Sequence, residues 1–282
     1  MSQPEIFGAI AELRAAVARW RGAGETIALV PTMGALHAGH LSLVEAARQH
    51  CRRVIVSIFV NPTQFAANED FGAYPRTFEA DVEKLAGAGV DGCFAPAPVE
   101  IYPEGFCTQV ITGGPALAGL EDRVRPEHFA GVALVVAKLL NQAQADSAFF
   151  GEKDFQQLAV IRRMAGDLDI PTRIFGAPTM REPDGLALSS RNVYLNAAQR
   201  AQAVLLSQVL RDTAEFLRAG GEVATGCAAA ARKIAGGGFA LDYFEARHAA
   251  TLAPIATLAE GPVRLLVAAR LGSVRLIDNW AV

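Results

Sequence analysis

Residues 26–40 read Thr-Ile-Ala-Leu-Val-Pro-Thr-Met-Gly-Ala-Leu-His-Ala-Gly-His, an apolar run that leads into a turn with two glycines and two histidines. The run at 26–30 predicts a buried strand, and the residues after it predict a turn that opens a helix. Gly34 and Gly39 would let the backbone pass close to a bulky anion. Because the first amides of a helix lack partners within the helix, this turn predicts a phosphate-binding site.

Two histidines, His37 and His40, strengthen this hypothesis. They lie three positions apart, so they would share one face of the new helix and could both donate to phosphate oxygens. The alternative is that one histidine caps the helix and the other packs against it. The four-residue motif is common by itself, but two histidines with two glycines at a strand-to-helix junction favour the phosphate site.

The composition bounds the class of protein. The chain has 282 residues, of which 51% are apolar, and this is enough to fill the core of one large or two modest domains. A net charge of -3, with 20% charged residues, provides no general electrostatic attraction for nucleic acid or an anionic membrane. We therefore expect no nucleic-acid partner and no membrane partner.

The sequence also predicts a cytoplasmic protein. Residues 1–5 lack the basic start and apolar stretch of a signal peptide, and the apolar segment 132–140 is short and contains Lys138. The four cysteines have no Cys-x-x-Cys spacing, which favours reduced thiols over a zinc site or a disulfide framework.

Strand and helix signals alternate through the first two thirds of the chain. The expected strands are 26–30, 54–60, 90–95, 147–150 and 172–175. The expected helices are 77–88, 132–142, 155–167 and one that follows His40 with Leu41, Val44 and Ala47 on its inner face. This alternation predicts a Rossmann-like, doubly wound parallel sheet. Ligands bind at the carboxyl ends of such strands, so residues 31–40, 61–65 and 151–154 should converge on one crevice.

A different pattern follows Arg181. Residues 182–185 predict a turn and 197–219 a long helix, and strands are expected at 241–245, 263–268 and 274–277, with a turn at Gly272. We expect a Rossmann-like, nucleotide-binding domain over 1–178, and a smaller α+β domain over 179–282. There are no internal repeats.

Six motifs, in order along the chain, resemble one enzyme family. They are PTMGALHAGH at 31–40, FVNPTQF at 59–65, YPR at 74–76, HFAGV at 128–132, FGEKDFQQL at 150–158 and DGLALSSRN at 184–192. Together they resemble the pantothenate synthetases, the pantoate-β-alanine ligases of coenzyme A biosynthesis, in the nucleotidyltransferase superfamily with the His-x-Gly-His motif. One departure is Glu127, where the family commonly has glycine or another small residue.

The resemblance implies an ATP-dependent condensation in two steps. The carboxylate of (R)-pantoate attacks the α-phosphorus of ATP to give pantoyl adenylate and pyrophosphate, and β-alanine then displaces AMP to give pantothenate. Since no three-ligand cluster of histidines or carboxylates is evident, Mg²⁺ should arrive on the ATP phosphates. The family usually forms homodimers, and its smaller domain would close over the ATP site.

The family pattern also implies roles for particular residues. The catalytic cations would be His37, His40, Lys153 and Arg191, which can stabilise negative charge at phosphorus. The implied contacts to ATP are Met33, Gly34, His37, Gly39, His40, Gly151, Glu152, Lys153, Asp154, Met180, Leu188, Ser189, Ser190 and Arg191.

The acid and amine substrates would be bound by neutral side chains. Gln64 and Gln157 would bind pantoate, and Gln64, Asn61 and Tyr74 would bind β-alanine. Without the surrounding motifs, Asn61 would be interpreted as part of a strand-ending turn, and residues 156–157 as a solvated helix start. Residues 151–154 could be both a helix cap and part of the site.

Glu121 and Arg125 are spaced like a surface ion pair. The family pattern suggests that they rim the active site in a flexible loop, with residues 113–115 loose enough for a lid that would protect the adenylate from water.

Three alternative functions each have their own sequence requirements. A small aminoacyl-tRNA synthetase would need a lysine-rich second signature loop and a basic domain for tRNA, but residues 188–191 and the acidic net charge fit neither. A nicotinamide-dependent dehydrogenase would need Gly-x-Gly-x-x-Gly after the first strand. In this chain the glycines after that strand, Gly34 and Gly39, are spaced differently. A non-catalytic nucleotide sensor is poorly excluded, since binding and catalytic residues overlap.

Overall fold

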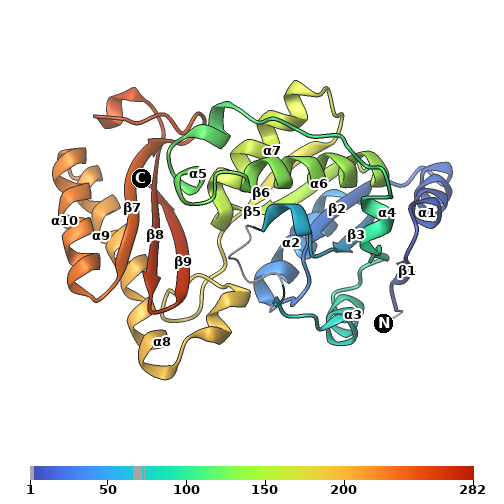
Figure 1. The fold of residues 1–282 in the computed structure, drawn as a ribbon, viewed down its shortest axis with the longest axis horizontal. Coiled ribbons are helices and arrows are strands. Elements are labelled where there is room, and N and C mark those ends of the chain that lie inside the picture. Colours follow the sequence, from blue (N-terminus) through green and yellow to red (C-terminus); the bar gives the residue numbers. More distant parts are fainter. Residues whose placement is uncertain (1–2, 66–71, 73) are drawn as a thin grey trace. The chain divides into compact units, whose positions relative to one another are not determined.

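The computed structural model describes residues 3–65, 72 and 74–282 (Figure 1). The described chain forms two compact units. The first unit comprises Met1–Gly113, Arg125–Glu152 and Val160–Pro178, and the second comprises Gly114–Val124, Lys153–Ala159 and Thr179–Val282. Two short segments from before residue 178 therefore pack with the second unit.

The first unit is built on a six-stranded parallel sheet in the order β1-β4-β3-β2-β5-β6. The strands are β1 (Glu5–Phe7), β2 (Ile27–Thr32), β3 (Arg53–Ile58), β4 (Gly92–Phe94), β5 (Ser147–Gly151) and β6 (Arg173–Ala177). This confirms the predicted Rossmann-like sheet. The chain runs outward from β2 through β3 to β4 and then returns to β5 on the other side of β2, so the strand order reverses between β2 and β5.

Helices cover this sheet. They are α1 (Ile10–Gly22), α2 (Ala38–His50), α3 (Phe78–Gly87), α4 (Pro98–Ile101), α6 (His128–Ala143) and α7 (Phe155–Asp167), of which α7 begins in the second unit and ends in the first. Helix α2 packs on β2 and β5, where Ala28 and Val30 contact its apolar side chains. Since side chains alternate along a strand, Ile27 and Leu29 point to the opposite face. Helices α1 and α6 contact each other, and both contact β2.

Several details of the first unit differ from the sequence prediction. The inner face of α2 carries Leu43 with Val44 and Ala47, whereas Leu41 is only half-buried. Helix α6 starts at His128, four residues earlier than expected, and β3 ends at Ile58. Strand β1 and helix α1 were not predicted.

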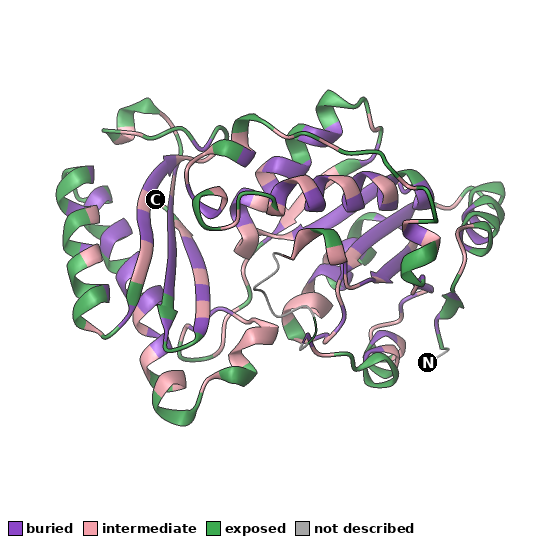
Figure 2. Cartoon of the chain, in the orientation of Figure 1, coloured by how far each residue is buried: buried purple, intermediate pink, exposed green. Residues whose placement is uncertain are grey.

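The second unit contains an antiparallel sheet in the order β7-β8-β9, made of β7 (Ala240–His248), β8 (Val263–Leu271) and β9 (Val274–Ala281). Helices α9 (Leu205–Arg218) and α10 (Val223–Gly236) pack on one face of it. On the other face, Leu266 and Ala268 contact Leu120 and Phe155 from the two short segments. Both faces of the sheet are therefore covered, and its strands are largely buried (Figure 2).

Two further features concern this unit. The turn expected at Gly272 lies between β8 and β9 and has a φ of +61°, which suits glycine. The helix expected over 197–219 is interrupted at Val204, so that α8 (Ala197–Ala203) and α9 are separate. The same unit contains the short helix α5 (Glu121–Val124). In the described part of the chain, no helix is long and apolar enough to cross a membrane.

Candidate active site

The two histidines of the glycine-rich turn lie side by side at the start of α2. His37 is the N-cap residue, and its Nδ1 accepts the N–H of Gly39 at 3.1 Å. The Nδ1 of His40 accepts the N–H of His37 at 3.3 Å, and the two ring centroids are 4.1 Å apart. Because each Nδ1 accepts a hydrogen bond, the proton of each neutral ring lies on Nε2. The imidazoles therefore cap the helix through Nδ1 and carry their donor N–H on the opposite nitrogen.

The carboxyl end of β5 lies next to this turn. Strands β2 and β5 are hydrogen-bonded neighbours, with Ala28 opposite Ser147 and Leu29 opposite Ala148. Gly151 ends β5, and the single-turn helix η4 (Glu152–Asp154) follows. Since the strand order reverses here, the ends of β2 and β5 form the position at which doubly wound sheets bind ligands.

Gln64 belongs to a polar network at the ends of β2 and β3. It lies in the helical turn η1 (Pro62–Gln64), and its Nε2 is 3.0 Å from the sulfur of Met33. Its Oε1 accepts a hydrogen bond from Nδ2 of Asn61 at 3.2 Å. The first unit thus brings Met33, Asn61 and Gln64, all predicted site residues, into contact.

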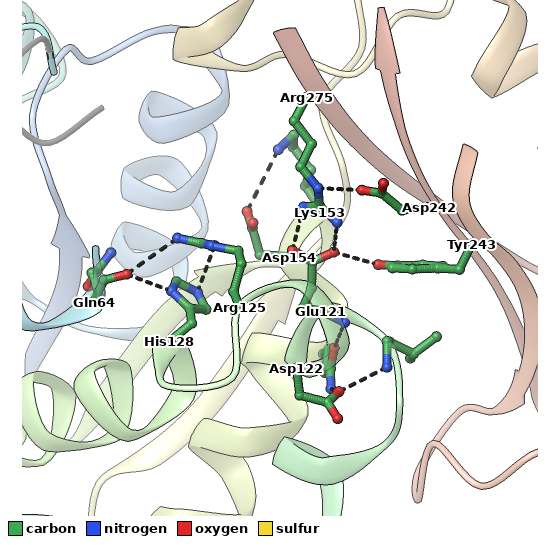
Figure 3. A network of polar contacts seen from close by, with 12 residues as sticks. Gln64, Glu121, Asp122, Arg125, His128, Lys153, Asp154, Asp242, Tyr243 and Arg275 are labelled. Atoms are coloured by element: carbon green, nitrogen blue, oxygen red, sulfur yellow. Dashed lines mark hydrogen bonds and ion pairs between the residues drawn. The ribbon is translucent and has the colours of Figure 1, made fainter. Parts of the chain in front are cut away.

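Arg125 and His128 hold the backbone of Gln64 (Figure 3). The carbonyl oxygen of Gln64 accepts from Nδ1 of His128 at 3.0 Å and from Nη2 of Arg125 at 3.3 Å. Nη1 of Arg125 donates to Nε2 of His128 at 3.2 Å, which fixes the histidine tautomer. His128 lies in the motif at 128–132, but that motif alone predicts no contact with Gln64.

Asn61 is buried and its side chain is engaged on both sides. Its Nδ2 donates to the carbonyl of Gly131 at 3.2 Å, and its Oδ1 accepts from the hydroxyl of Tyr102 at 2.8 Å. A Cβ atom at Gly131 would lie 2.2 Å from the carbonyl oxygen of Thr63, so only glycine lets α6 come this close to η1. Asn61 therefore caps η1, three residues after β3 ends, and supports Gln64.

The remaining predicted β-alanine residue, Tyr74, is also buried in the first unit. Its ring packs edge-on against Phe65, with the ring centroids 6.0 Å apart.

Lys153 is anchored to β9 in the second unit. Its backbone carbonyl accepts a hydrogen bond from Nδ2 of Asn279 at 2.8 Å, and its Nζ lies 3.9 Å from Oδ2 of Asp154. Asn279 is buried, and its Oδ1 accepts from Nε of Arg264 at 2.6 Å. The position of the Lys153 backbone is thus determined by residues more than a hundred positions away in the sequence.

The segment from Met180 to Arg191, which contains further predicted ATP contacts, is also anchored to β9. The N–H of Leu188 donates to the carbonyl of Met180 at 2.9 Å, so these two predicted ATP contacts are paired. Between them in sequence, Arg181 forms a two-pronged ion pair with the buried Asp278, at 2.7 and 2.8 Å. Oγ of Ser189 accepts the N–H of Arg191 at 3.3 Å, which caps the short helix η5 (Ser190–Tyr194).

The adjacent glutamines of α7 have different environments. Gln156 is buried, and its side chain contacts the carbonyl of Pro115 at 2.8 Å and the N–H of Glu121 at 2.9 Å. The interpretation of 156–157 as a solvated helix start is therefore wrong for Gln156. Gln157, the predicted pantoate residue, is half-buried.

Glu121 is buried, whereas its spacing from Arg125 had suggested a surface residue. Its carboxylate accepts from the hydroxyl of Tyr243 at 2.7 Å and from both terminal nitrogens of Arg275, at 2.6 and 2.8 Å (Figure 3). Burial, together with the charge of Glu121, raises the pKa of Tyr243 well above its ordinary value, so the phenol stays protonated and donates. Burial alone would lower the pKa of Arg275, but its bonds to Glu121 and Asp242 outweigh that effect and raise it.

The predicted site residues are distributed over both units. The first unit contains Met33, Gly34, His37, Gly39, His40, Asn61, Gln64, Tyr74, Gly151 and Glu152, and the second contains Lys153, Asp154, Gln157, Met180, Leu188, Ser189, Ser190 and Arg191. Among the residues with a described structure, no group of three or more histidines, cysteines or carboxylates could hold a metal ion.

The departure at Glu127 has little structural consequence. This residue is exposed and precedes α6 with a φ of -96°, an ordinary value that requires no glycine.

Comparisons with known proteins agree with the site's motifs. The family model described as pantoate-beta-alanine ligase matches residues 5–281. The pantothenate synthetase of Rhodopseudomonas palustris (strain HaA2) is 56% identical over 99% of both chains. A solved pantothenate synthetase from Thermus thermophilus superposes with a TM-score of 0.92 at 47% identity, over 98% of both chains.

A second solved structure carries ligands. The pantoate-beta-alanine ligase of Francisella tularensis, in a complex with beta-gamma ATP and β-alanine, is 34% identical and has a TM-score of 0.82. The match covers 99% of this chain and 97% of that one. Motifs, fold and full-length similarity all lead to one conclusion: the chain belongs to the pantoate-beta-alanine ligase family.

Proposed function

We propose that the protein is an AMP-forming ligase that condenses (R)-pantoate with β-alanine to give pantothenate, and that the residues described above perform this reaction. Full-length membership in the family supports the reaction. The structural observation that carries the assignment of residues is the His37–His40 pair at the end of β2, next to the end of β5. Oriented donors at this position suit a nucleotide triphosphate.

The first step would be the attack of the pantoate carboxylate on the α-phosphorus of ATP. A bond forms between the carboxylate oxygen and phosphorus, and the bond from phosphorus to the bridging oxygen breaks as pyrophosphate leaves. His37 and His40 would donate from Nε2 to phosphate oxygens, while Lys153 and Arg191 would supply positive charge. Fixed donors of this kind stabilise the charge that develops in the transition state.

The remaining ATP contacts are proposed from the motifs. Backbone and side chains of Met33, Gly34, Gly39, Gly151, Glu152 and Asp154 would contact ATP, together with Met180, Leu188, Ser189 and Ser190. Mg²⁺ would be bound through the ATP phosphates, since the described residues offer no cluster to hold it, and it would neutralise phosphate charge.

The second step would be the attack of the β-alanine amine on the pantoyl carbonyl, which forms the amide bond and releases AMP. Gln64 and Gln157 would bind the hydroxyl and carboxylate of pantoate through neutral amide groups, which can both donate and accept hydrogen bonds. Gln64 and Tyr74 would also bind β-alanine. The contacts of Asn61 with Gln64 and Gly131 favour an indirect role for Asn61, in which it orients the Gln64 amide.

We further infer a homodimer that acts in the cytoplasm, without a nucleic-acid or membrane partner. Light scattering coupled to size-exclusion chromatography would measure the mass in solution. A single species of twice the chain mass supports the dimer, and a monomer at micromolar concentration contradicts it.

Product analysis tests the reaction itself. Purified protein with ATP, Mg²⁺, pantoate and β-alanine should release AMP and pyrophosphate in step with pantothenate. Release of ADP and phosphate would mean attack at the γ-phosphorus and would overturn the proposal. ATP binding without turnover would favour the alternative of a nucleotide sensor.

A further inference from the structure

The turn that leads into the histidine pair has an unusual backbone. Gly34 has a φ of +82° and Ala35, which is not glycine, has a φ of +51°. Alanine is disfavoured in this left-handed region, so the surrounding structure must hold the turn in place. Besides the hydroxyl of Thr32, which accepts the N–H of Gly34, the groups that hold it come from α3.

Asp81, on the first turns of α3, binds the turn from one side. Its Oδ2 accepts the N–H of Ala35 at 2.8 Å, and its Oδ1 accepts the N–H of Leu36 at 2.8 Å. Asp81 is fully buried, and Oγ1 of Thr77 donates to its Oδ2 at 3.1 Å. A buried carboxylate with this set of donors is well satisfied.

Lys84, three residues further along α3, binds the same turn through a carbonyl. Its Nζ donates to the carbonyl of Leu36 at 2.8 Å and lies 3.7 Å from Oδ1 of Asp81. The N–H of Leu36 is thus held by Asp81, and its C=O is held by Lys84.

The peptide bond between Leu36 and His37 connects this pair to the imidazoles. Lys84 binds the C=O of that peptide, and the N–H of the same peptide donates to Nδ1 of His40. Binding at the C=O fixes the peptide plane and polarises the N–H at its other end. A stronger N–H donor at Nδ1 favours the tautomer of His40 that carries its proton on Nε2.

We infer that Asp81 and Lys84 are positioning residues for His37 and His40: they hold the peptide that orients the His40 ring and sets its tautomer. This inference rests on the proposed function of the histidines as phosphate donors. Neither α3 residue is required to touch substrate. The sequence alone does not indicate this positioning role, since Asp81 and Lys84 lie on an ordinary amphipathic helix.

The test compares Asp81→Asn and Lys84→Met with a matched control, Asp91→Asn. Asp91 also accepts a backbone N–H, from Val54 at 2.9 Å, and binds a cation, Arg53, at 2.7 Å. It precedes β4, at the amino ends of the strands, away from the histidines. Loss of stability alone should therefore appear in all three variants.

Two readouts separate positioning from a merely structural role. Pantoate-dependent exchange of pyrophosphate into ATP should lose roughly 10-fold to 100-fold in kcat for Asp81→Asn and Lys84→Met, with a smaller change in KM for ATP. The ¹⁵N spectrum of the histidine side chains should show His40 protonated on Nε2 in the wild type and a mixture of tautomers in Lys84→Met. Lys84→Arg, which keeps a donor at this position, should restore most of the kcat of exchange and most of the Nε2-protonated form of His40.

The outcomes are distinct. Variants that melt lower, as Asp91→Asn does, but keep wild-type kcat and a single His40 tautomer would overturn the inference. If Asp81→Asn does not fold, Lys84→Met and Lys84→Arg decide the question. The tautomer measurement needs no substrate, so a wild-type protein without exchange activity would refute the proposed function while the positioning of His40 could still be judged.

Discussion

The side-chain amide of Asn279 donates to the backbone carbonyl of Lys153 across 2.8 Å. The proposed catalytic lysine is therefore held by β9, the last strand of the chain. The same strand contains Asp278, which binds Arg181 in the segment between Met180 and Leu188. Two groups of proposed ATP contacts in the second unit are thus both held by side chains of β9.

Asn279→Asp should reduce adenylation about 10-fold, because the new carboxylate keeps the bond from Arg264 but repels the Lys153 carbonyl. The loss of one buried hydrogen bond should lower the free energy of unfolding by about 1 to 3 kcal/mol. Pyrophosphate exchange and urea unfolding measure the two effects. Asn141→Asp is the control, since Asn141 also donates to a backbone carbonyl, that of Ala137 at 2.8 Å, on α6. Equal loss of activity in both variants would contradict the anchoring role.

His40→Asn should lower the adenylation rate roughly 100-fold or more with little change in melting temperature. The asparagine oxygen can replace Nδ1 as the acceptor for the N–H of His37, but nothing replaces the donor at Nε2. His40→Ala should lose as much activity and, in addition, about 1 kcal/mol of stability. If His40→Asn keeps near-normal exchange, the ring serves only as a cap.

Lys153→Met should also lower adenylation roughly 100-fold or more, because it removes a cation aimed at developing charge while the apolar stem remains. The backbone bond to Asn279 is unchanged in this variant. Thermal melting should therefore stay close to that of the wild type. A large drop in melting temperature with normal exchange would assign Lys153 a structural role only.

The two proposed pantoate glutamines should differ between the half-reactions. Gln157→Ala should slow adenylate formation more than the attack of β-alanine on preformed pantoyl adenylate, whereas Gln64→Ala should slow both. An unpaired substrate group in a desolvated pocket costs about 1 to 3 kcal/mol, or roughly 10-fold to 100-fold in rate. Single-turnover reactions started from ATP, or from isolated adenylate, measure the two steps. The assignment fails if Gln64→Ala spares the second step while Gln157→Ala slows it as much as the first.

The buried Glu121–Arg275 pair should contribute to stability. The spacing of Glu121 and Arg125 in the sequence had suggested only a weak surface ion pair. Arg275→Met leaves the Glu121 carboxylate buried without its main partner and should cost about 3 to 5 kcal/mol of unfolding free energy. Adding Glu121→Gln should recover a large part of this loss, because the buried charge is then removed. Urea denaturation of the single and double variants measures the coupling. Strictly additive losses would contradict the pairing.

The sequence was sufficient to predict the parallel sheet and the helix opening at the histidines, because buried strands and strand-to-helix turns have strong local patterns. It did not reveal the three-residue strand β1, which is too short for a pattern. It also did not predict the helix break at Val204, since residues 197–218 contain neither proline nor glycine. The inner face of α2 was assigned to Leu41 in place of Leu43, a small rotation that depends on how α2 packs on the sheet.

The long-range contacts of the candidate site could not be predicted. The bonds from Asp81 to the turn and from Asn279 to Lys153 join residues 45 and 126 positions apart. The sequence around Glu121 does not show whether its carboxylate is buried or solvated. The answer depends on its partners, which lie 122 and 154 positions away. Local motifs thus predict which groups bear the chemistry, whereas the fold determines how those groups are held.

The most direct test of the central claim is pantoate-dependent exchange of labelled pyrophosphate into ATP, measured without β-alanine. We expect exchange that requires pantoate and Mg²⁺, is nearly abolished in His40→Asn, and persists in Asp91→Asn. Exchange that is absent from the folded wild-type protein, or that proceeds equally without pantoate, would contradict the claim that this site forms an acyl adenylate from pantoate.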